Sequence, residues 1–359
     1  LSLVRQRTIL KKYSSKSYWK NKTVLITGIN GFIGSNLSKL LLSLGAKIVG
    51  IANDKKKNSL LEYYAIKKDI KIHYLDLSDY KKLDTIIKNY QIHTCIHLAA
   101  QVDVNVASVN PFLTFESNIR GTYNLLELLR HQKSIKSIVV ASSDKAYGHY
   151  ATKELPYKED YDLRAKYPYD VSKAAGDMIA KSYASDMFKM PIMITRFTNI
   201  YGPGQLNFTA LIPDCILSCF NYRKFIPRSN GMNKRDFLFV EDVCDLYLCL
   251  SYNLAKDKSL RGEVFNAGTG SGYKVKDIVK KICIKSNNNE NYQSILPRFK
   301  NKKSFGEIKN QFMTFDKINK YFKWKPRYSI DDGIHKTIIW YTDFLKKHDY
   351  KSFLSKELK

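Results

Sequence analysis

The sequence predicts an α/β protein built on a doubly wound parallel sheet, with a smaller C-terminal lobe. Short apolar runs alternate with helix-length segments through the first half of the 359-residue chain. A glycine-rich turn separates the first apolar run from the first helical segment. Strands that alternate with helices form parallel sheets through right-handed crossovers, and both faces of such sheets are covered, which favours wholly apolar strands.

The expected elements follow from these periodicities. Six strands are predicted at Thr23–Thr27, Lys47–Ala52, Lys71–Leu77, Thr94–Ala100, Ser137–Ser143 and Ile192–Phe197. Helices are expected over Ile33–Leu44, Ser117–His131 and Asp170–Met187. In the irregular second half, Asp236–Val243 and Glu263–Gly268 are the segments expected to return to the sheet.

This pattern divides the chain into three parts. Residues 1–19 are basic and poorly patterned, and we expect a plain N-terminal extension, with a transit peptide as the alternative. Residues 20–202 form the expected sheet domain, which 233–268 rejoin. The remainder of 203–359 is expected to be mainly a substrate-binding lobe.

Composition excludes several classes of function. The net charge is +27, but the 60 Lys and Arg residues are spread along the whole chain, so we expect an anionic substrate and no nucleic-acid partner. No apolar run is long enough to span a bilayer, so no membrane partner is expected. The cysteines lack CxxC or His spacing, which predicts buried free thiols, no metal site and a reducing, cytoplasmic location. They are Cys95, Cys215, Cys219, Cys244, Cys249 and Cys283.

A GxxGxxG pattern follows the first strand directly. Glycines here allow a tight turn, close approach of the backbone to a pyrophosphate, and close packing of the next helix. The start of that helix offers free N–H groups to phosphate. The sequence therefore predicts a Rossmann dinucleotide site formed by Gly28, Asn30, Gly31, Phe32, Ile33 and Gly34.

The choice between NAD and NADP depends on the end of the second strand. Asp54 is positioned to bind a ribose 2′-hydroxyl, which favours NAD. The lysines at 55–57 are suited to a 2′-phosphate, so NADP stays open. Asp76 and Leu77, at the end of the third strand, are candidates for the adenine pocket.

Tyr169 and Lys173 form a YxxxK pattern that places both side chains on one face of a predicted helix. We expect an ammonium and an oxidised nicotinamide to lower the phenol pKa, so that Tyr169 can accept a proton from a sugar hydroxyl. The same spacing at Tyr63 and Tyr64 is interpreted as surface helix, because only Tyr169 follows the fifth strand. Ligands bind beyond the carboxyl ends of such strands.

The fifth strand ends in Ser143, Asp144 and Lys145. Ser143 is suited to hydrogen-bond the reacting hydroxyl, and Asp144 and Lys145 provide an acid and a base side by side. Their attraction favours an ionised Asp144 unless burial opposes it. The alternative is a polar loop with an incidental ion pair.

Together these motifs resemble the extended short-chain dehydrogenase/reductases, the NAD-dependent epimerases and dehydratases of nucleotide sugars. The resemblance covers about Trp19 to Tyr341. The motifs are Gly28/Gly31/Gly34, His97–Gln101, Asn118, Ser143, Tyr169/Lys173 and Arg196–Asn199.

Within that family the chain is most similar to CDP-glucose 4,6-dehydratases. Ser143-Asp144-Lys145 and the segments Tyr18–Lys22, Leu211–Asp214 and Arg235–Phe237 are similar to that group. The glycine turn and Tyr201–Gly204 follow the general epimerase pattern instead, so GDP- and UDP-sugars stay open.

The resemblance implies a three-stage reaction. Tyr169 removes the proton of the 4-hydroxyl while hydride leaves C4, Asp144 protonates the departing 6-hydroxyl and Lys145 removes the C5 proton. Hydride then returns to C6, which gives a 4-keto-6-deoxy sugar. Lys173 is expected to hold the nicotinamide ribose and tune Tyr169.

The resemblance also implies binding residues and an assembly. Further cofactor contacts are expected from Leu98, Ala99, Ala100 and Asn118, besides Tyr169 and Lys173. The nucleotide sugar is expected to contact Gln101, Ser143, Asn199, Arg228 and Arg235. A homodimer is expected through the helices near Asn118–Leu129 and Asp170–Met187.

Two other functions stay open at this point. A nucleotide-sugar 4-epimerase shares Tyr169 and Lys173 but needs no acid at C6. A catalytically silent binding protein would keep only the fold.

Overall fold

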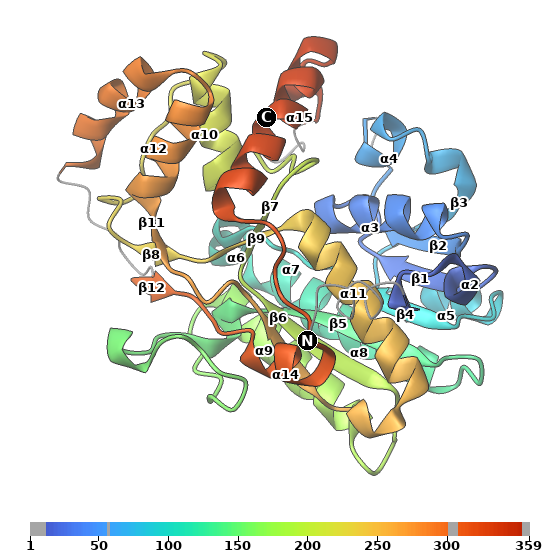
Figure 1. Cartoon of the computed structure of the whole chain (residues 1–359). Coiled ribbons are helices and arrows are strands. Elements are labelled where there is room, and N and C mark those ends of the chain that lie inside the picture. Colours follow the sequence, from blue (N-terminus) through green and yellow to red (C-terminus); the bar gives the residue numbers. More distant parts are fainter. Residues whose placement is uncertain (1–11, 56–57, 301–307, 354–359) are drawn as a thin grey trace.

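A seven-stranded sheet forms the centre of the computed structural model, which describes residues 12–55, 58–300 and 308–353. All neighbouring strands are parallel, in the order β10-β6-β5-β4-β1-β2-β3 (Figure 1). This confirms the predicted Rossmann α/β class. The strands are β1 Thr23–Thr27, β2 Lys47–Ala52, β3 Ile70–Tyr74, β4 Thr94–His97, β5 Ser137–Ser143, β6 Ile192–Phe197 and β10 Val264–Ala267.

The strand order reverses beside β1, and this reversal positions the site. The chain runs outward from β1 through β2 to β3, then restarts at β4 on the other side of β1 and runs outward again. The loops that leave β1 and β4 therefore diverge to opposite faces of the sheet and open a crevice at its carboxyl edge.

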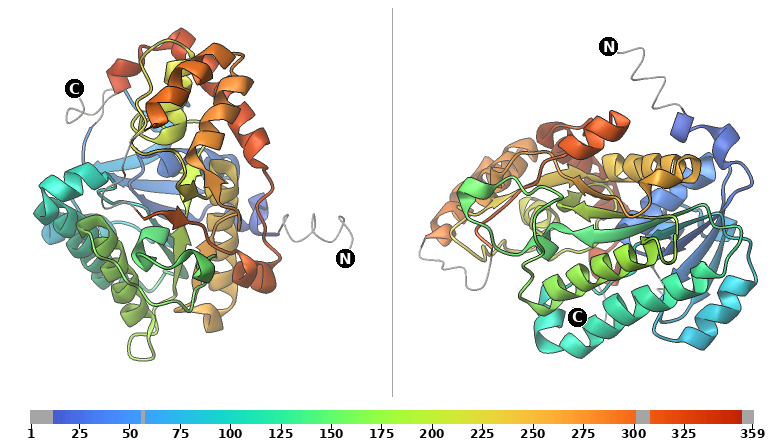
Figure 2. Two further views of the ribbon diagram at one scale, coloured as in Figure 1. Left: turned by 90° about the vertical axis from the view of Figure 1, so that its left-hand side faces the viewer. Right: turned by 90° about the horizontal axis from the view of Figure 1, so that it is seen from below.

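Helices cover both faces of this sheet (Figure 2). Val24 and Ile26 of β1 pack with α3 (Phe32–Ser43) and α11 (Val240–Lys256) on one face. Leu25 points to the other face, toward α5 (Tyr80–Lys88), α8 (Gly121–Arg130) and α9 (Pro168–Ala184). Because successive strand residues alternate between faces, one apolar run contributes to two cores.

One expected return to the sheet is correct and the other is wrong. Glu263–Gly268 contains β10, which returns to the main sheet beside β6. Asp236–Val243 contributes only the short β9 (Phe237–Phe239), which pairs with β7 (Asn199–Tyr201) in a separate two-stranded sheet. The chain then enters α11, whose apolar residues cover the main sheet instead of joining it.

A second lobe lies beside the carboxyl edge of the sheet (Figure 1). Its apolar core joins α10, α12 and α15, and a small sheet of β11, β8 and β12 borders it. Its elements are β8 Lys234–Arg235, β11 Tyr273–Lys274, β12 Asn310–Gln311, α10 Leu211–Cys219, α12 Val275–Lys285, α13 Asn289–Ile295 and α15 Ile330–Lys347. The remaining helices are α2 Lys16–Trp19, α4 Leu60–Tyr63, α6 Val104–Val109, α7 Pro111–Phe115 and α14 Asp316–Phe322.

The segment before β1 packs on the sheet domain rather than standing apart from it. Trp19 is fully buried, and its indole N–H donates to the carbonyl of Tyr13 at 2.6 Å. The Tyr13 hydroxyl donates to Asp245 of α11 at 2.8 Å. Residues 1–11 of the expected extension lie outside the described residues.

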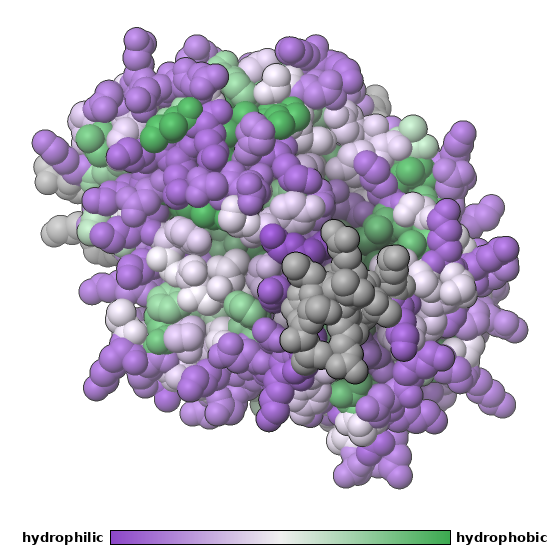
Figure 3. All heavy atoms as spheres, in the orientation of Figure 1, coloured by the Kyte–Doolittle hydropathy of each residue, from purple (hydrophilic) through white to green (hydrophobic). Residues whose placement is uncertain are grey.

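Polar side chains dominate the face in Figure 3, where apolar residues form separate patches. Among the described residues, no helix combines the length and apolar character that crossing a bilayer requires.

Because the backbone packs closely around Gly34, we expect that adding a single methyl group there destabilises the protein. A Cβ at Gly34 would lie 2.5 Å from the carbonyl oxygen of Gly28 and 2.8 Å from Cα of Ile29, and neither backbone atom can swing away. We expect Gly34→Ala to lower the free energy of unfolding by about 1–3 kcal/mol, measured by urea denaturation. The matched control is Gly176→Ala in α9, where the new Cβ meets only ordinary contacts. Equal stability of the two variants would contradict the packing argument.

Candidate active site

The turn after β1 forms one wall of the crevice. Gly28 has a φ of +70°, and a Cβ there would lie 2.9 Å from the amide nitrogen of Ala99, so only glycine allows this approach. Gly31 caps α3 without any side-chain hydrogen bond to the helix start. The first N–H groups of α3 are therefore not occupied by a side-chain cap, as a phosphate-binding turn requires.

The predicted ribose and adenine residues lie around this turn. Asn30 donates to the backbone carbonyl of Asp54 at 3.1 Å, which joins the glycine turn to the loop after β2. Asp54 lies two residues beyond the strand end and is exposed. Asp76 is exposed and accepts from the Ser78 amide, whereas Leu77 is buried. Of the lysines suited to a 2′-phosphate, 56 and 57 lie outside the described residues.

The loop after β4 forms the floor. The amides of Leu98 and Ala99 both donate to Thr27 Oγ1 at 3.1 Å. Asn118 binds the backbone of Gln101 through both ends of its amide, at 2.7 and 2.9 Å, and also donates to Ser172 of α9. Asn118 thus positions the floor against α9.

A π-helical turn at Glu116–Arg120, between α7 and α8, directs the Asn118 side chain inward. Ala100 follows Ala99 in the same partly buried loop. The Gln101 side chain bonds to Asp103 and Thr114, so it braces the loop.

Ser143, Asp144 and Tyr169 come together at the carboxyl edge. The Ser143 hydroxyl donates to Asp144 Oδ1 at 3.1 Å and lies close enough to the Tyr169 phenol to act on its pKa, in the lowering direction. The second Asp144 oxygen is buried without a hydrogen-bond partner among the described residues. Asp144, the predicted acid, therefore lies beside Tyr169, which is predicted to accept the proton of the 4-hydroxyl. The second oxygen of Asp144 is available to a ligand hydroxyl.

The Tyr169 pKa in this structure is opposite in direction to the expectation. Burial raises it above its usual value, and the nearby carboxylates of Asp144 and Asp170 raise it further. Lys173 does not offset this, because its ammonium donates to the Ala141 carbonyl at 2.5 Å and its own pKa is lowered by burial to about 8. A phenolate at neutral pH therefore requires additional positive charge from a ligand.

Burial also opposes ionisation of Asp144. Its pKa is raised by desolvation, although Lys145, Ser143 and Arg235 act in the opposite direction. A carboxyl group that keeps its proton near neutral pH can donate that proton.

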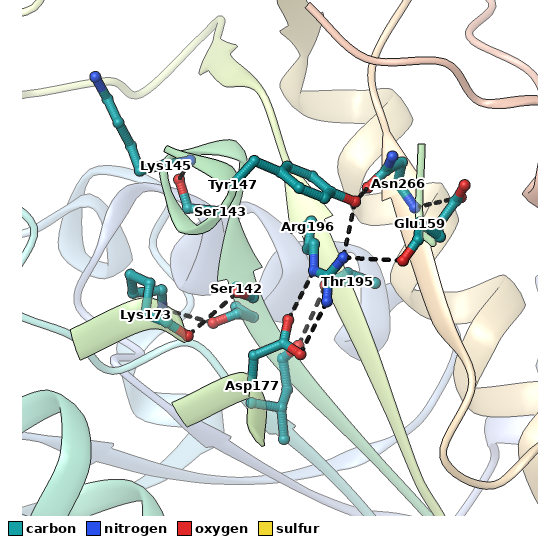
Figure 4. Close-up of polar contacts among 12 residues, drawn as sticks. Ser142, Ser143, Lys145, Tyr147, Glu159, Lys173, Asp177, Thr195, Arg196 and Asn266 are labelled. Carbon is teal, nitrogen blue, oxygen red and sulfur yellow. Dashed lines mark hydrogen bonds and ion pairs between the residues drawn. The ribbon is translucent and has the colours of Figure 1, made fainter. Parts of the chain in front are cut away.

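Asp170 is an acid that the sequence analysis did not assign to the site. Burial raises its pKa to about 6, with Lys145 lowering it and Asp144 raising it. Lys145 thus lies in the field of two carboxyl groups, and Figure 4 shows its side chain extending away from the buried network behind β5.

A buried network behind these residues was also missed (Figure 4). Arg196 of β6 forms a fork-like ion pair with Asp177 of α9, at 2.8 and 3.1 Å, and both side chains are at most 1% exposed. Arg196 donates to the Tyr147 hydroxyl, which donates to Asn266 of β10. The network joins β6, α9 and β10 immediately after the catalytic loop. No local sequence pattern links these positions.

Three of the five predicted substrate residues border one cavity in the second lobe, of about 370 Å³. Asn199, Arg228 and Arg235 all line it, with α10 and Phe225 forming apolar walls. Arg228 is exposed and donates to the carbonyl of Thr209, which also lines the cavity. Arg235 is buried and donates to the carbonyls of Lys234 and Lys309. Asn199 donates to the carbonyl of Asp236. Gln101 and Ser143 belong to the crevice rather than to this cavity.

Comparison with known proteins gives the family. A family model described as GDP-mannose 4,6 dehydratase matches residues 25–337, most of the chain. The chain belongs to this family. The match confirms the predicted relationship to epimerases and dehydratases.

Both dehydratases and epimerases are found among the proteins that are similar to the chain. It is 30% identical to a human dTDP-D-glucose 4,6-dehydratase, over 92% of each chain. It is 27% identical to a UDP-glucuronate 4-epimerase of Thermodesulfobacterium geofontis, over 88% of this chain and 95% of that protein. Among solved structures, a dTDP-glucose 4,6-dehydratase of Bacillus anthracis in complex with NAD aligns with a TM-score of 0.74 and 26% identity, over 90% of this chain and 98% of that one.

The buried His97 should make the protein less stable to unfolding in acid. It is buried between Thr27 Oγ1 at 2.7 Å and Thr122 Oγ1 at 2.9 Å, and burial lowers its pKa from 6.5 to about 3. Between these values the unfolded chain binds one more proton than the folded chain, so acidification through this range favours unfolding by about 1.4 kcal/mol per pH unit.

We expect His97→Gln, which keeps polar contacts without the titration, to have a flatter dependence of unfolding free energy on pH. Urea denaturation across the range from 6.5 down to about 3 measures this slope. Identical slopes for both proteins would show that His97 does not titrate in this way.

Proposed function

We propose that the chain is an NAD-dependent nucleotide-sugar 4,6-dehydratase, which converts an NDP-hexose to an NDP-4-keto-6-deoxyhexose. The buried Asp144 carries this proposal. It has a raised pKa and a hydrogen bond to Ser143, beside Tyr169. Loss of water from C6 needs a proton donor at the departing hydroxyl, and 4-epimerisation does not.

The crevice fits NAD as the cofactor. Two glycines whose Cβ positions are blocked and a helix start without a side-chain cap match a pyrophosphate, and the exposed Asp54 is available for a ribose hydroxyl. The similar Bacillus anthracis enzyme was crystallised with NAD. When bound, NAD supplies a reversible hydride acceptor and a positive charge in its oxidised form. Because burial of Tyr169 opposes phenolate, that charge is what this phenol lacks in the protein alone.

The residues then divide the proton transfers between them. Tyr169 accepts the proton of the 4-hydroxyl. Ser143, which lies beside the Tyr169 phenol, holds that hydroxyl by a hydrogen bond. Lys173 fixes the nicotinamide ribose from its place on the same helical face. Asp144 donates a proton to the 6-hydroxyl, which leaves as water. Lys145, as the neutral amine, removes the C5 proton and returns it to C5 when C6 is reduced.

The second lobe holds the nucleotide diphosphate. Arg228 and Arg235 face one cavity with Asn199, and guanidinium groups pair well with phosphate oxygens. The buried Arg235 also acts electrostatically on Asp144, so the diphosphate site and the catalytic acid are close enough to interact. The base stays open among CDP, GDP and UDP.

A 4-epimerase is the second candidate, because a UDP-glucuronate 4-epimerase is nearly as similar as the dehydratases. Tyr169, Lys173 and Ser143 suit both reactions. Asp144 distinguishes them, since an epimerase has no leaving hydroxyl to protonate.

Incubation of the purified protein with CDP-, GDP- and UDP-hexoses tests the proposal. We expect one of them to lose the mass of one water, detected by mass spectrometry, without net consumption of NAD. An isomer of unchanged mass would establish the epimerase instead. No conversion of any of the three, with NAD added, would contradict both.

Asp144→Asn is the discriminating variant. It keeps the shape of Asp144 but removes the acid, so we expect dehydration to fall by about 100- to 10,000-fold, measured as turnover under saturating substrate. Glu154→Gln, at an exposed position in the loop before α9, is the control and should retain activity. Full water loss by Asp144→Asn would rule out the assigned role.

We also propose that the chain forms a homodimer through α8 and α9, the two helices expected from the sequence, together with α7. These helices pack together and expose large apolar side chains, with Phe112 72% and Met178 64% exposed. Water-exposed apolar surface of this kind favours association. We expect Phe112→Glu with Met178→Glu to shift a dimer to monomer in sedimentation experiments, whereas Ile339→Glu on α15 should not. A monomeric parent protein would contradict this interface.

A further inference from the structure

Three of the six cysteines meet inside the second lobe, outside the sheet domain that carries Asp144 and Tyr169. Cys215 and Cys219 lie four residues apart and so share one face of α10. Cys283 lies on α12, which packs against that face. All three side chains are buried, and all six cysteines of the chain are free thiols.

Their sulfur atoms form a compact group. The three Sγ atoms lie within 4.8 Å of one another, and Cys219 Sγ is 3.5 Å from Cys283 Sγ. Three thiolates bound tetrahedrally to one Zn²⁺ at about 2.3 Å have sulfurs about 3.8 Å apart. The observed spacing therefore approaches that of a ligand set without movement of either helix.

One polar side chain from α13 faces the cluster. Asn291 Nδ2 donates to Cys219 Sγ at 3.4 Å. Donors of this kind orient metal-bound thiolates and compensate their charge. The rest of the environment is apolar, since the cluster belongs to the lobe's hydrophobic core. Sulfur ligands without carboxylates select soft ions over Mg²⁺ or Ca²⁺.

We propose that Cys215, Cys219 and Cys283 bind one soft divalent metal ion, of the class of Zn²⁺, through their three sulfur atoms. A water molecule completes the tetrahedron, as in other sites with three protein ligands. The ion cross-links α10 and α12. Those helices also present Leu211, Asp214 and Val275 to the substrate cavity, so the site stabilises one wall of that cavity.

The full-length protein, purified with a thiol reductant and no chelator, provides the test. We expect about one Zn²⁺ per chain by elemental mass spectrometry. Exchange with Cd²⁺ should give a thiolate-to-metal charge-transfer absorption in the ultraviolet that saturates at one equivalent. Cys219→Ser and Cys283→Ser should each abolish the absorption, whereas Cys244→Ser, at a buried cysteine on α11, should keep it.

The wild-type protein decides the question even where a serine variant fails to fold. Zn²⁺ should raise its Tm, and a chelator should lower it again. Absence of the Cd²⁺ absorption in the wild type would overturn the site, as would its persistence in both Cys219→Ser and Cys283→Ser. A Cys219–Cys283 disulfide in the reductant-purified protein would also overturn it.

Discussion

The ion pair between Arg196 and Asp177 is the interaction on which the site depends most. Both groups are withdrawn from water, and a buried charge is tolerated only when it is paired and hydrogen-bonded. Removal of either partner leaves the other uncompensated, at a cost of about 3–5 kcal/mol. The pair fixes α9 against β6, and through Tyr147 and Asn266 it also fixes β10. The catalytic helix is thus attached to the sheet by a contact with few alternative geometries.

Desolvation then governs the chemistry that this framework supports. Burial raises the pKa of Asp144 and Tyr169 and lowers that of Lys173, so each group is shifted toward its neutral form. For an acid this is useful directly, because a raised pKa favours the protonated form of Asp144 that the proposed reaction requires. For a base the shift is a disadvantage, because the neutral phenol of Tyr169 cannot accept a proton. A bound cation, such as the oxidised nicotinamide, would favour the phenolate and so allow Tyr169 to act. In the proposed reaction, proton abstraction is therefore coupled to occupancy of the cofactor crevice.

Local patterns in the sequence predicted the sheet and the main motifs well. The strands from β1 to β6 and the glycine turn depend on neighbouring residues, so periodicity and spacing were sufficient to find them. The segment Asp236–Val243 was assigned wrongly because its apolar residues belong to two elements. The short strand β9 leads directly into the buried helix α11, and no change of pattern marks the boundary. The Arg196–Asp177–Tyr147 network and the cysteine cluster were missed for another reason. Asp177 and Tyr147 lie 19 and 49 residues from Arg196, and Cys283 lies 64 residues from Cys219, so no local period relates these partners.

The contact between Tyr13 and Asp245 has a consequence for how the protein is made. The two residues are 232 positions apart, and the helix that receives the N-terminal segment is synthesised long after that segment. Until α11 emerges from the ribosome, the indole of Trp19 and one apolar side of the first strands have only part of their covering layer, which α3 supplies. The nascent chain therefore exposes part of its future interior through most of translation, which makes it a natural client for chaperones that shield apolar surface.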